Sequence, residues 1–222
     1  MDYTPFLVTF KLACLTTLIL FVIGIPIAYF IAFSKWRGKA ILESIMMLPI
    51  VLPPTVLGFY FIFFLGPNSG VGKFFDELFG HSLAFSFQGI LLGSIIYCLP
   101  FMLTPIINGF RSIPKNIIES TKLLNKSRIN ALWYVFIPFI KRSILSGVLL
   151  TFAHTIGEFG LVLMIGGKFP ETNVASVAIY DEMTAMNFDV VHSYALILLI
   201  ISFVLIFLLN LLTRKTSRSD IA

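Results

Sequence analysis

Two ionisable side chains occur inside an apolar stretch that carries no other charge. His154 and Glu158 are four residues apart within residues 144–165. An ionisable group at membrane depth is costly and by default indicates a function. Because they are four residues apart, the two side chains are expected to share one helical face and could hydrogen-bond each other. A bare carboxylate would repel an anion, so we expect a structural or gating role for Glu158; a capped or protonated helix-packing carboxyl is the alternative.

Proline and threonine occur together in a second apolar stretch, residues 48–58. It contains Pro49, Pro53 and Pro54, followed directly by Thr55. Proline lacks a backbone donor and clashes with the preceding turn, so the helix must kink or unwind here. Irregular backbone at membrane depth is tolerated only where it faces protein or a water-filled cavity. The break is therefore either a buried structural kink or part of a pathway, as broken helices are in transporters.

The composition is that of an integral membrane protein. Of the 222 residues, 58% are hydrophobic and only 12% are charged, and the mean hydropathy is +0.95. Soluble proteins have about a quarter of their residues charged. The net charge of +5 comes from cations in the loops, where they set topology, so no nucleic-acid partner is expected. Cys14 and Cys98 have neither CxxC spacing nor a nearby His pair, so no metal site is predicted.

The length and spacing of the apolar stretches predict an all-α membrane protein with a single transmembrane domain over residues 1–222. A helix needs about 20 apolar residues to cross the bilayer. The expected spans cover residues 6–33, 41–65, 87–110, 144–165 and 193–212. Most Lys and Arg residues follow the first, third and fifth of them. By the positive-inside rule, the N-terminus is expected outside and the C-terminus in the cytoplasm.

The elements that would position a partner lie in the basic segment 111–142, the one long interruption rich in Lys and Arg. Ile117, Ile118 and Thr121 recur at helical spacing, and Pro114 suits the start of a helix. A short amphipathic helix rimmed by cations can dock into a groove on another protein. A solvated loop whose cations only orient the chain is the alternative.

Nucleotide hydrolysis is not predicted for this chain. The sequence contains no G-x-x-x-x-G-K-[S/T] phosphate loop, and it lacks the G-x-S-x-G and HExxH patterns. We therefore expect a non-catalytic protein that takes its energy from another subunit or from an ion gradient. A chain with so few spans is small for a self-sufficient transporter, and we expect it to line a pathway as one half of a dimer.

The basic segment resembles the EAA loop of permease subunits in binding-protein-dependent ABC importers, whose pattern is E-A-A-x3-G-x9-I-x-L-P. Asn125 stands at the glycine position, and asparagine adopts left-handed backbone more readily than most residues. Val135 and Ile137 stand at the Ile and Leu positions of the pattern. The resemblance implies that the loop docks on an ATPase subunit. The residues expected to carry that contact are Glu119, Ser120, Thr121, Lys122, Asn125 and Pro138.

Within that family the chain is most similar to molybdate and tungstate permeases. Residues 48–58, Ile156-Gly-Glu-Phe-Gly160 and Ala178-Ile-Tyr-Asp181 carry this resemblance. It implies the type I importer fold and import of molybdate or tungstate by alternating access across the bacterial cytoplasmic (inner) membrane. The implied partners are a second permease copy, two ATPase subunits that use ATP and magnesium, and an external or periplasmic oxyanion-binding protein. No cofactor is expected on this chain.

For an anionic substrate, we expect the pathway to be lined by groups that make weak polar contacts. The apolar stretches hold few cations, so hydroxyls and backbone N–H groups would face the dianion. The predicted pathway residues are Pro53, Pro54, Thr55, Thr104, Thr151 and Glu158. Sulfate and thiosulfate permeases carry similar stretches and remain an alternative. A stand-alone secondary transporter would need no docking loop, and a membrane-embedded enzyme would have only His154 and Glu158 as a catalytic cluster.

Overall fold

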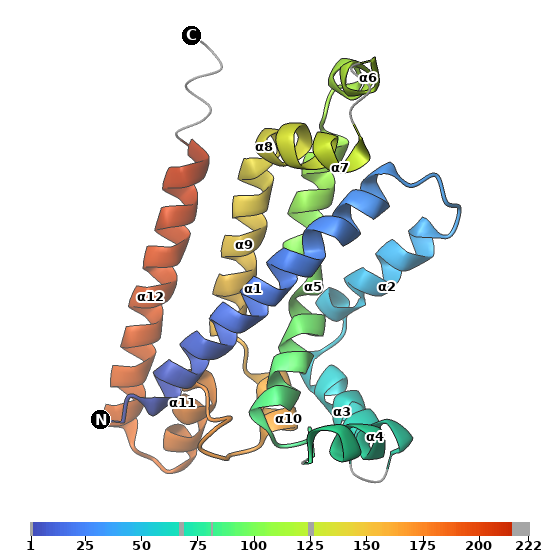
Figure 1. The fold of residues 1–222 in the computed structure, drawn as a ribbon. Coiled ribbons are helices and arrows are strands. Elements are labelled where there is room, and N and C mark those ends of the chain that lie inside the picture. The colour runs from blue at the N-terminus through green and yellow to red at the C-terminus, as the bar shows by residue number, and fades with distance from the viewer. Residues whose placement is uncertain (1, 67–68, 81, 124–126, 215–222) are drawn as a thin grey trace.

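The computed structural model describes residues 2–66, 69–80, 82–123 and 127–214, and every regular element within them is a helix (Figure 1). The predicted all-α class is therefore confirmed for the described residues. Helices satisfy their own backbone hydrogen bonds, which is what a chain in hydrocarbon requires.

Three helices are long and apolar enough to cross a membrane by themselves. They are α1 (Thr4–Phe33), α5 (Phe87–Arg111) and α12 (Phe188–Arg214, with the apolar part counted over Phe188–Leu208). Two bent pairs also qualify when each is taken as one span. One joins α2 (Lys39–Val51) to α3 (Pro54–Leu65) at 112°, and the other joins Arg128–Phe139 to α9 (Lys141–Ile156) at 74°. The described chain thus has three candidate spans, or up to five.

The prolines differ in what they do to the helices. The predicted break in residues 48–58 is present, and it falls between α2 and α3 at Leu52 and Pro53, both with extended backbone. Pro49 lies within α2, and Pro100 and Pro105 lie within a continuous α5. Two successive prolines, rather than a single one, therefore mark the place where the chain leaves the helix.

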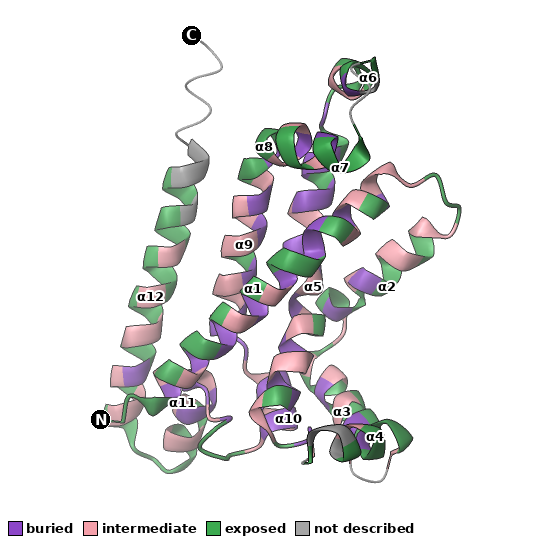
Figure 2. Cartoon of the chain, viewed as in Figure 1, coloured by how far each residue is buried: buried purple, intermediate pink, exposed green. Residues whose placement is uncertain are grey.

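The core is built where α1 and α9 pack on α5. Figure 2 shows buried residues along α5 and the facing sides of its neighbours, whereas α12 is mostly exposed. Close approach depends on small residues. A Cβ on Gly147 would lie 2.8 Å from the carbonyl oxygen of Met102, so α9 meets the α5 backbone directly. Near one end, Tyr29, Phe110 and Phe136 form an aromatic cluster with ring centroids 5.6 and 6.3 Å from Tyr29.

The short helices gather at the two ends of the bundle (Figure 1). The end that holds the N-terminus carries α4 (Gly70–Phe79), α10 (Gly160–Gly166) and α11 (Ala175–Thr184). The opposite end carries the basic segment, which folds as α6 (Lys115–Leu123), α7 (Arg128–Ala131), the π-helix η1 (Leu132–Phe136) and α8 (Ile137–Phe139). The long helices thus separate the basic segment from the acidic residues of α11.

Candidate functional site

A cavity of about 440 Å³ lies where two helix breaks meet. One break, between α2 and α3, contributes Pro54 and Thr55. The other follows α9 and contributes Gly157 to Gly160, and α5 adds Tyr97. The cavity brings together three of the predicted pathway residues, Pro54, Thr55 and Glu158. Glu158 lies about a hundred residues after the other two in the sequence.

Glycine allows the two breaks to touch. A Cβ on Gly160 would lie 3.2 Å from the Cβ of Pro54 and 3.4 Å from Cγ2 of Thr55. A Cβ on Gly58 would lie only 2.5 Å from the Cβ of Met164. The half-helices α3 and α10 therefore pack closely, and a larger side chain at either glycine would push the breaks apart.

Glu158 is fixed by two serines from other helices. Its side chain is 4% exposed, and Oε2 accepts a hydrogen bond of 2.8 Å from Oγ of Ser94 on α5. Its backbone carbonyl accepts a 2.6 Å hydrogen bond from Oγ of Ser176 on α11. The second carboxyl oxygen, Oε1, is buried and has no hydrogen-bond partner among the described residues. One residue thus joins the break after α9 to both α5 and α11.

The predicted helical pairing of His154 with Glu158 is wrong. Helix α9 ends at Ile156 and the chain resumes as α10 at Gly160, so Glu158 lies in a break and not one turn along the same helix. The imidazole stacks on Phe101 with ring centroids 3.9 Å apart, while the carboxyl group of Glu158 bonds Ser94 instead. Gly157 and Gly160 lie at the two ends of the break, and glycine disfavours helix, which accounts for the break locally.

Thr104 and Thr151 do not line this cavity. The hydroxyl of Thr104 lies 3.7 Å from Sδ of Met47, in a smaller cavity of about 40 Å³ between α2 and α5. Thr151 is fully buried within the bundle, and its hydroxyl has no partner among the described residues. Pro53 is exposed and precedes the cavity-lining Pro54. A pathway role for these three residues remains a prediction.

Sequence reasoning missed the residues that hold the site together. Ser94 is fully buried in an apolar helix, and Ser176 lies at the start of α11. The one available signal was the Gly93-Ser94 pair, because a small polar residue inside an apolar span usually has a partner. Nothing in the sequence indicated that this partner lies 64 residues away.

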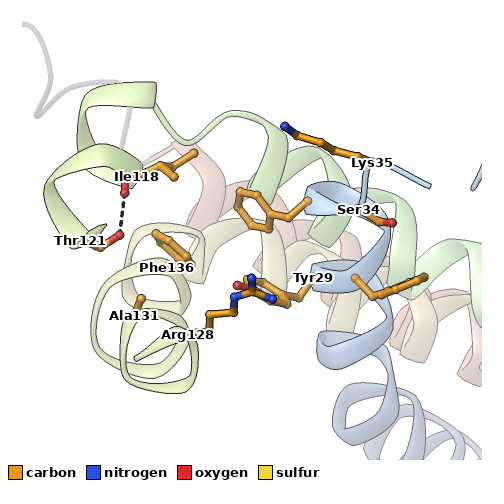
Figure 3. Close-up of a pocket in the computed structure, with 10 residues that line it drawn as sticks. Tyr29, Ser34, Lys35, Ile118, Thr121, Arg128, Ala131 and Phe136 are labelled. Carbon is orange, nitrogen blue, oxygen red and sulfur yellow. Dashed lines mark hydrogen bonds between the residues drawn. The ribbon is translucent and has the colours of Figure 1, made fainter. Parts of the chain in front are cut away.

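The predicted docking residues lie on a helical hairpin at the basic end. Helix α6 begins after Pro114, as predicted, and exposes Glu119 and Ser120. Thr121 is buried on its inner side, with Oγ1 donating to the carbonyl of Ile118 at 2.7 Å (Figure 3). The side chain of Lys122 and the whole of Asn125 lie outside the described residues.

The second half of the hairpin leads into α9 through an irregular helix. Ser127 caps α7 by accepting a 3.2 Å hydrogen bond from the N–H of Asn130. The π-helix η1 then leads to the exposed Pro138 in α8. Glu119, Ser120 and Pro138 are thus available to a partner, whereas Thr121 supports α6 from inside.

Solved structures place the fold. A bacterial ABC transporter involved in the import of the acidic polysaccharide alginate matches with a TM-score of 0.78 over 96% of this chain and 79% of that chain, at 18% identity. A second structure, of an alginate ABC transporter in complex with an alginate pentasaccharide-bound periplasmic protein, gives 0.77 over 94% and 76%, also at 18% identity. At this identity the likeness shows the fold, that of an ABC importer permease.

Sequence relatives extend over nearly the whole chain. The molybdenum transport system permease protein ModB of Azotobacter vinelandii is 37% identical over 94% of this chain and 92% of its own length. A putative molybdenum transport system permease protein of Bacillus subtilis is 28% identical over the same shares, 94% and 92%. The molybdate/tungstate transport system permease protein WtpB of Methanocaldococcus jannaschii is 28% identical over 96% and 82%.

The family model for the binding-protein-dependent transport system inner membrane component matches residues 24–218. That range contains both helix breaks, the cavity between them and the complete basic segment. The resemblance drawn from the EAA pattern is thereby confirmed at the level of the family. This chain belongs to the binding-protein-dependent transport system inner membrane components, the non-catalytic, multi-pass permease subunits of ABC transporters.

Proposed function

We propose that this chain is the membrane-spanning subunit of an ATP-driven importer that carries molybdate or tungstate across the bacterial cytoplasmic membrane. The observation that carries the proposal is the 37% identity, over 94% of the chain, to a permease named for molybdenum transport. The other relatives described above are named for molybdenum, molybdate or tungstate as well. This agreement favours these oxyanions over sulfate or thiosulfate.

The proposed topology has five spans, over residues 6–33, 41–65, 87–110, 144–165 and 193–212, with the N-terminus outside. Support comes from the distribution of cations. The loop after α1, the basic segment and the end of α12 all lie at one end of the bundle (Figure 1). By the positive-inside rule this end faces the cytoplasm. The cavity then lies between the two membrane surfaces, where a substrate would have to pass.

The cavity suits an anion that has to be held only weakly. The N–H of Thr55 belongs to the first turn of α3, where N–H groups lack acceptors within the helix. The N-terminus of a half-helix at membrane depth attracts anions in other transporters. Ser94 holds one oxygen of the Glu158 carboxyl group. We propose that the dianion passes along the Thr55 side of the cavity, opposite Glu158.

The proposed coupling runs through α6. Two ATPase subunits, which use ATP and magnesium, would dock on the exposed face that includes Glu119 and Ser120, one on each permease of a homodimer. A binding protein would deliver the oxyanion at the opposite end, near α4 and α11. The alginate transporter, whose fold is similar, was solved with a periplasmic protein bound, which supports such a partner. Alternating access would then repack the close contact between α3 and α10.

The test is ATPase activity of the reconstituted complex with its binding protein. Molybdate and tungstate, each loaded on the binding protein, are expected to stimulate hydrolysis several-fold over the unloaded protein, whereas sulfate is not. Stimulation by sulfate alone would support the same import mechanism but show that the substrate is sulfate. A chain that recruits no ATPase and still transports molybdate would overturn the proposal in favour of a secondary transporter.

A further inference from the structure

A groove of about 580 Å³ lies between the end of α1 and the inner side of the helical hairpin that α6, α7, η1 and α8 form, called the coupling hairpin below (Figure 3). Its walls come from α1, from Lys35 in the following loop, and from α6, α7 and η1. It is separate from the cavity between the helix breaks, with which it shares no lining residue. On the hairpin side the groove is lined by Thr121, which is buried on the inner side of α6.

The charged side chains known to line the groove are both positive. Lys35 and Arg128 enter it from opposite walls, and none of the described residues that line it is an aspartate or a glutamate. Both cations are exposed, and neither has an ion-pair partner among the described residues. Arg128 and Tyr29 both line the groove (Figure 3). Two unpaired cations facing one groove attract an anionic group, and the attraction is strongest where water is partly excluded.

The remaining wall is aromatic, and part of it is exposed on α1. The ring of Phe136 stacks with Phe33 at 5.5 Å and with Tyr29 at 6.3 Å. Phe30 lines the groove and is 52% exposed on the membrane-spanning α1, six residues before the exposed Trp36. Tryptophan marks the membrane–water interface. The groove therefore has cations at headgroup level and apolar surface at the level of the first acyl carbons.

We propose that this groove binds an anionic phospholipid, with the lipid phosphate between Lys35 and Arg128 and an acyl chain along Phe30. Basic pockets between membrane helices on the cytoplasmic side bind acidic headgroups in the same way. A bound lipid would contact both α1 and the inner side of α6, and would thereby hold the coupling hairpin against the bundle. The site itself is independent of the substrate, and only its cytoplasmic placement rests on the proposed function.

The test compares two probes, phosphatidylglycerol and phosphatidylcholine, on the purified permease–ATPase complex by native mass spectrometry. The groove variants are Lys35→Gln and Arg128→Gln. The matched control is Arg37→Gln, which removes an exposed cation from the same loop but does not line the groove. We expect the wild type and the control to retain phosphatidylglycerol preferentially. Each groove variant should lose about fivefold in retention, since one cation near a membrane surface contributes about 1 kcal/mol. Equal loss in the control would overturn the proposal.

A second measurement separates a lipid from a protein occupant. ATPase activity is compared in vesicles of phosphatidylcholine alone and in vesicles that also contain phosphatidylglycerol. We expect phosphatidylglycerol to raise the activity of the wild type, and the double variant Lys35→Gln/Arg128→Gln to abolish that difference. A double variant that recruits less ATPase subunit in both vesicle types would show that the groove belongs to a protein interface, and the lipid site would be wrong. Selective lipid retention in a complex that transports no molybdate would support this site while the proposed function failed.

Discussion

Glu158 is a buried residue held by partners on two different helices. Its side chain and its backbone carbonyl are held by Ser94 and Ser176, which belong to different helices. A buried carboxyl group with such partners sets the geometry of the break between α9 and α10. A structural or gating role for Glu158 remains a prediction, and the contact that supports it is with Ser94 and not with His154.

The contact between Glu158 and Ser94 can be tested by a double-mutant cycle. Glu158→Gln keeps a carbonyl oxygen that can accept from Ser94, so we expect thermal stability close to wild type. Glu158→Ala and Ser94→Ala should each lower stability by about 0.6–2 kcal/mol, the range for hydrogen bonds between membrane helices. The double variant should lose no more than the worse single variant, as measured by thermal unfolding in detergent. Additive losses would show that the two residues act independently.

Thr55 is the predicted pathway residue that the structure places best. Thr55→Val keeps the shape of the side chain and removes the hydroxyl, so we expect molybdate uptake to fall several-fold while the ATPase subunit is still recruited. Thr55→Ser retains the hydroxyl and is the matched control, with uptake near wild type. Uptake by proteoliposomes measures both. If the valine and serine variants transport equally well, the hydroxyl of Thr55 does not face the anion.

At the scale of elements, α2 is a helix with few buried residues. Only Met46 and Pro49 are buried in it, and its far end is tied to α5 by the ion pair between Glu43 and Arg111 at 2.6 Å. The break at Leu52 and Pro53 gives α2 a hinge at its other end. An element with few buried contacts and a hinge is a natural moving part in a transport cycle.

Whether this ion pair holds α2 against α5 can be tested by removing the charge of Glu43 and by exchanging the two residues. The pair is partly exposed and contributes at most about 1 kcal/mol, so Glu43→Gln should raise the reactivity of a cysteine introduced at Ile107 by up to about fivefold. Ile107 lines the small cavity between α2 and α5 and is 5% exposed. The swapped pair Glu43→Arg/Arg111→Glu should return the labelling rate towards wild type. A swapped variant as reactive as the single variants would show that the pair does not hold α2 against α5.

The sequence predicted the positions of the helices better than the side-chain contacts between them. Apolar length alone indicated α1, α5 and α12, and the double proline indicated the break before α3, because both signals are local. The break at Gly157–Gly160 was missed since hydropathy continues through it, although two glycines flank Glu158. The partnership with Ser94 depends on the packing of α9 against α5, which no local pattern encodes.

At the scale of the whole molecule, the fold places the proposed coupling hairpin and the cavity at different levels of the same helices. The hairpin that carries Glu119 lies at one end, and α10 and α11 lie at the other (Figure 1). Helices α5 and α9 connect them, and α9 leads from the hairpin directly into the break that holds Glu158. A displacement of the hairpin by an ATPase would therefore reach the cavity through a single rigid helix.

Coupled uptake of molybdate tests the central claim most directly. The permease, its ATPase subunit and the loaded binding protein are combined in proteoliposomes, and uptake is measured with and without ATP. We predict ATP-dependent uptake that Glu119→Ala lowers at least tenfold, the equivalent of about 1.4 kcal/mol of coupling. Arg37→Ala, which removes an exposed charge at the same end of the bundle but outside α6, should leave uptake unchanged. Molybdate uptake that needs no ATP, or that survives the loss of Glu119, would contradict the account.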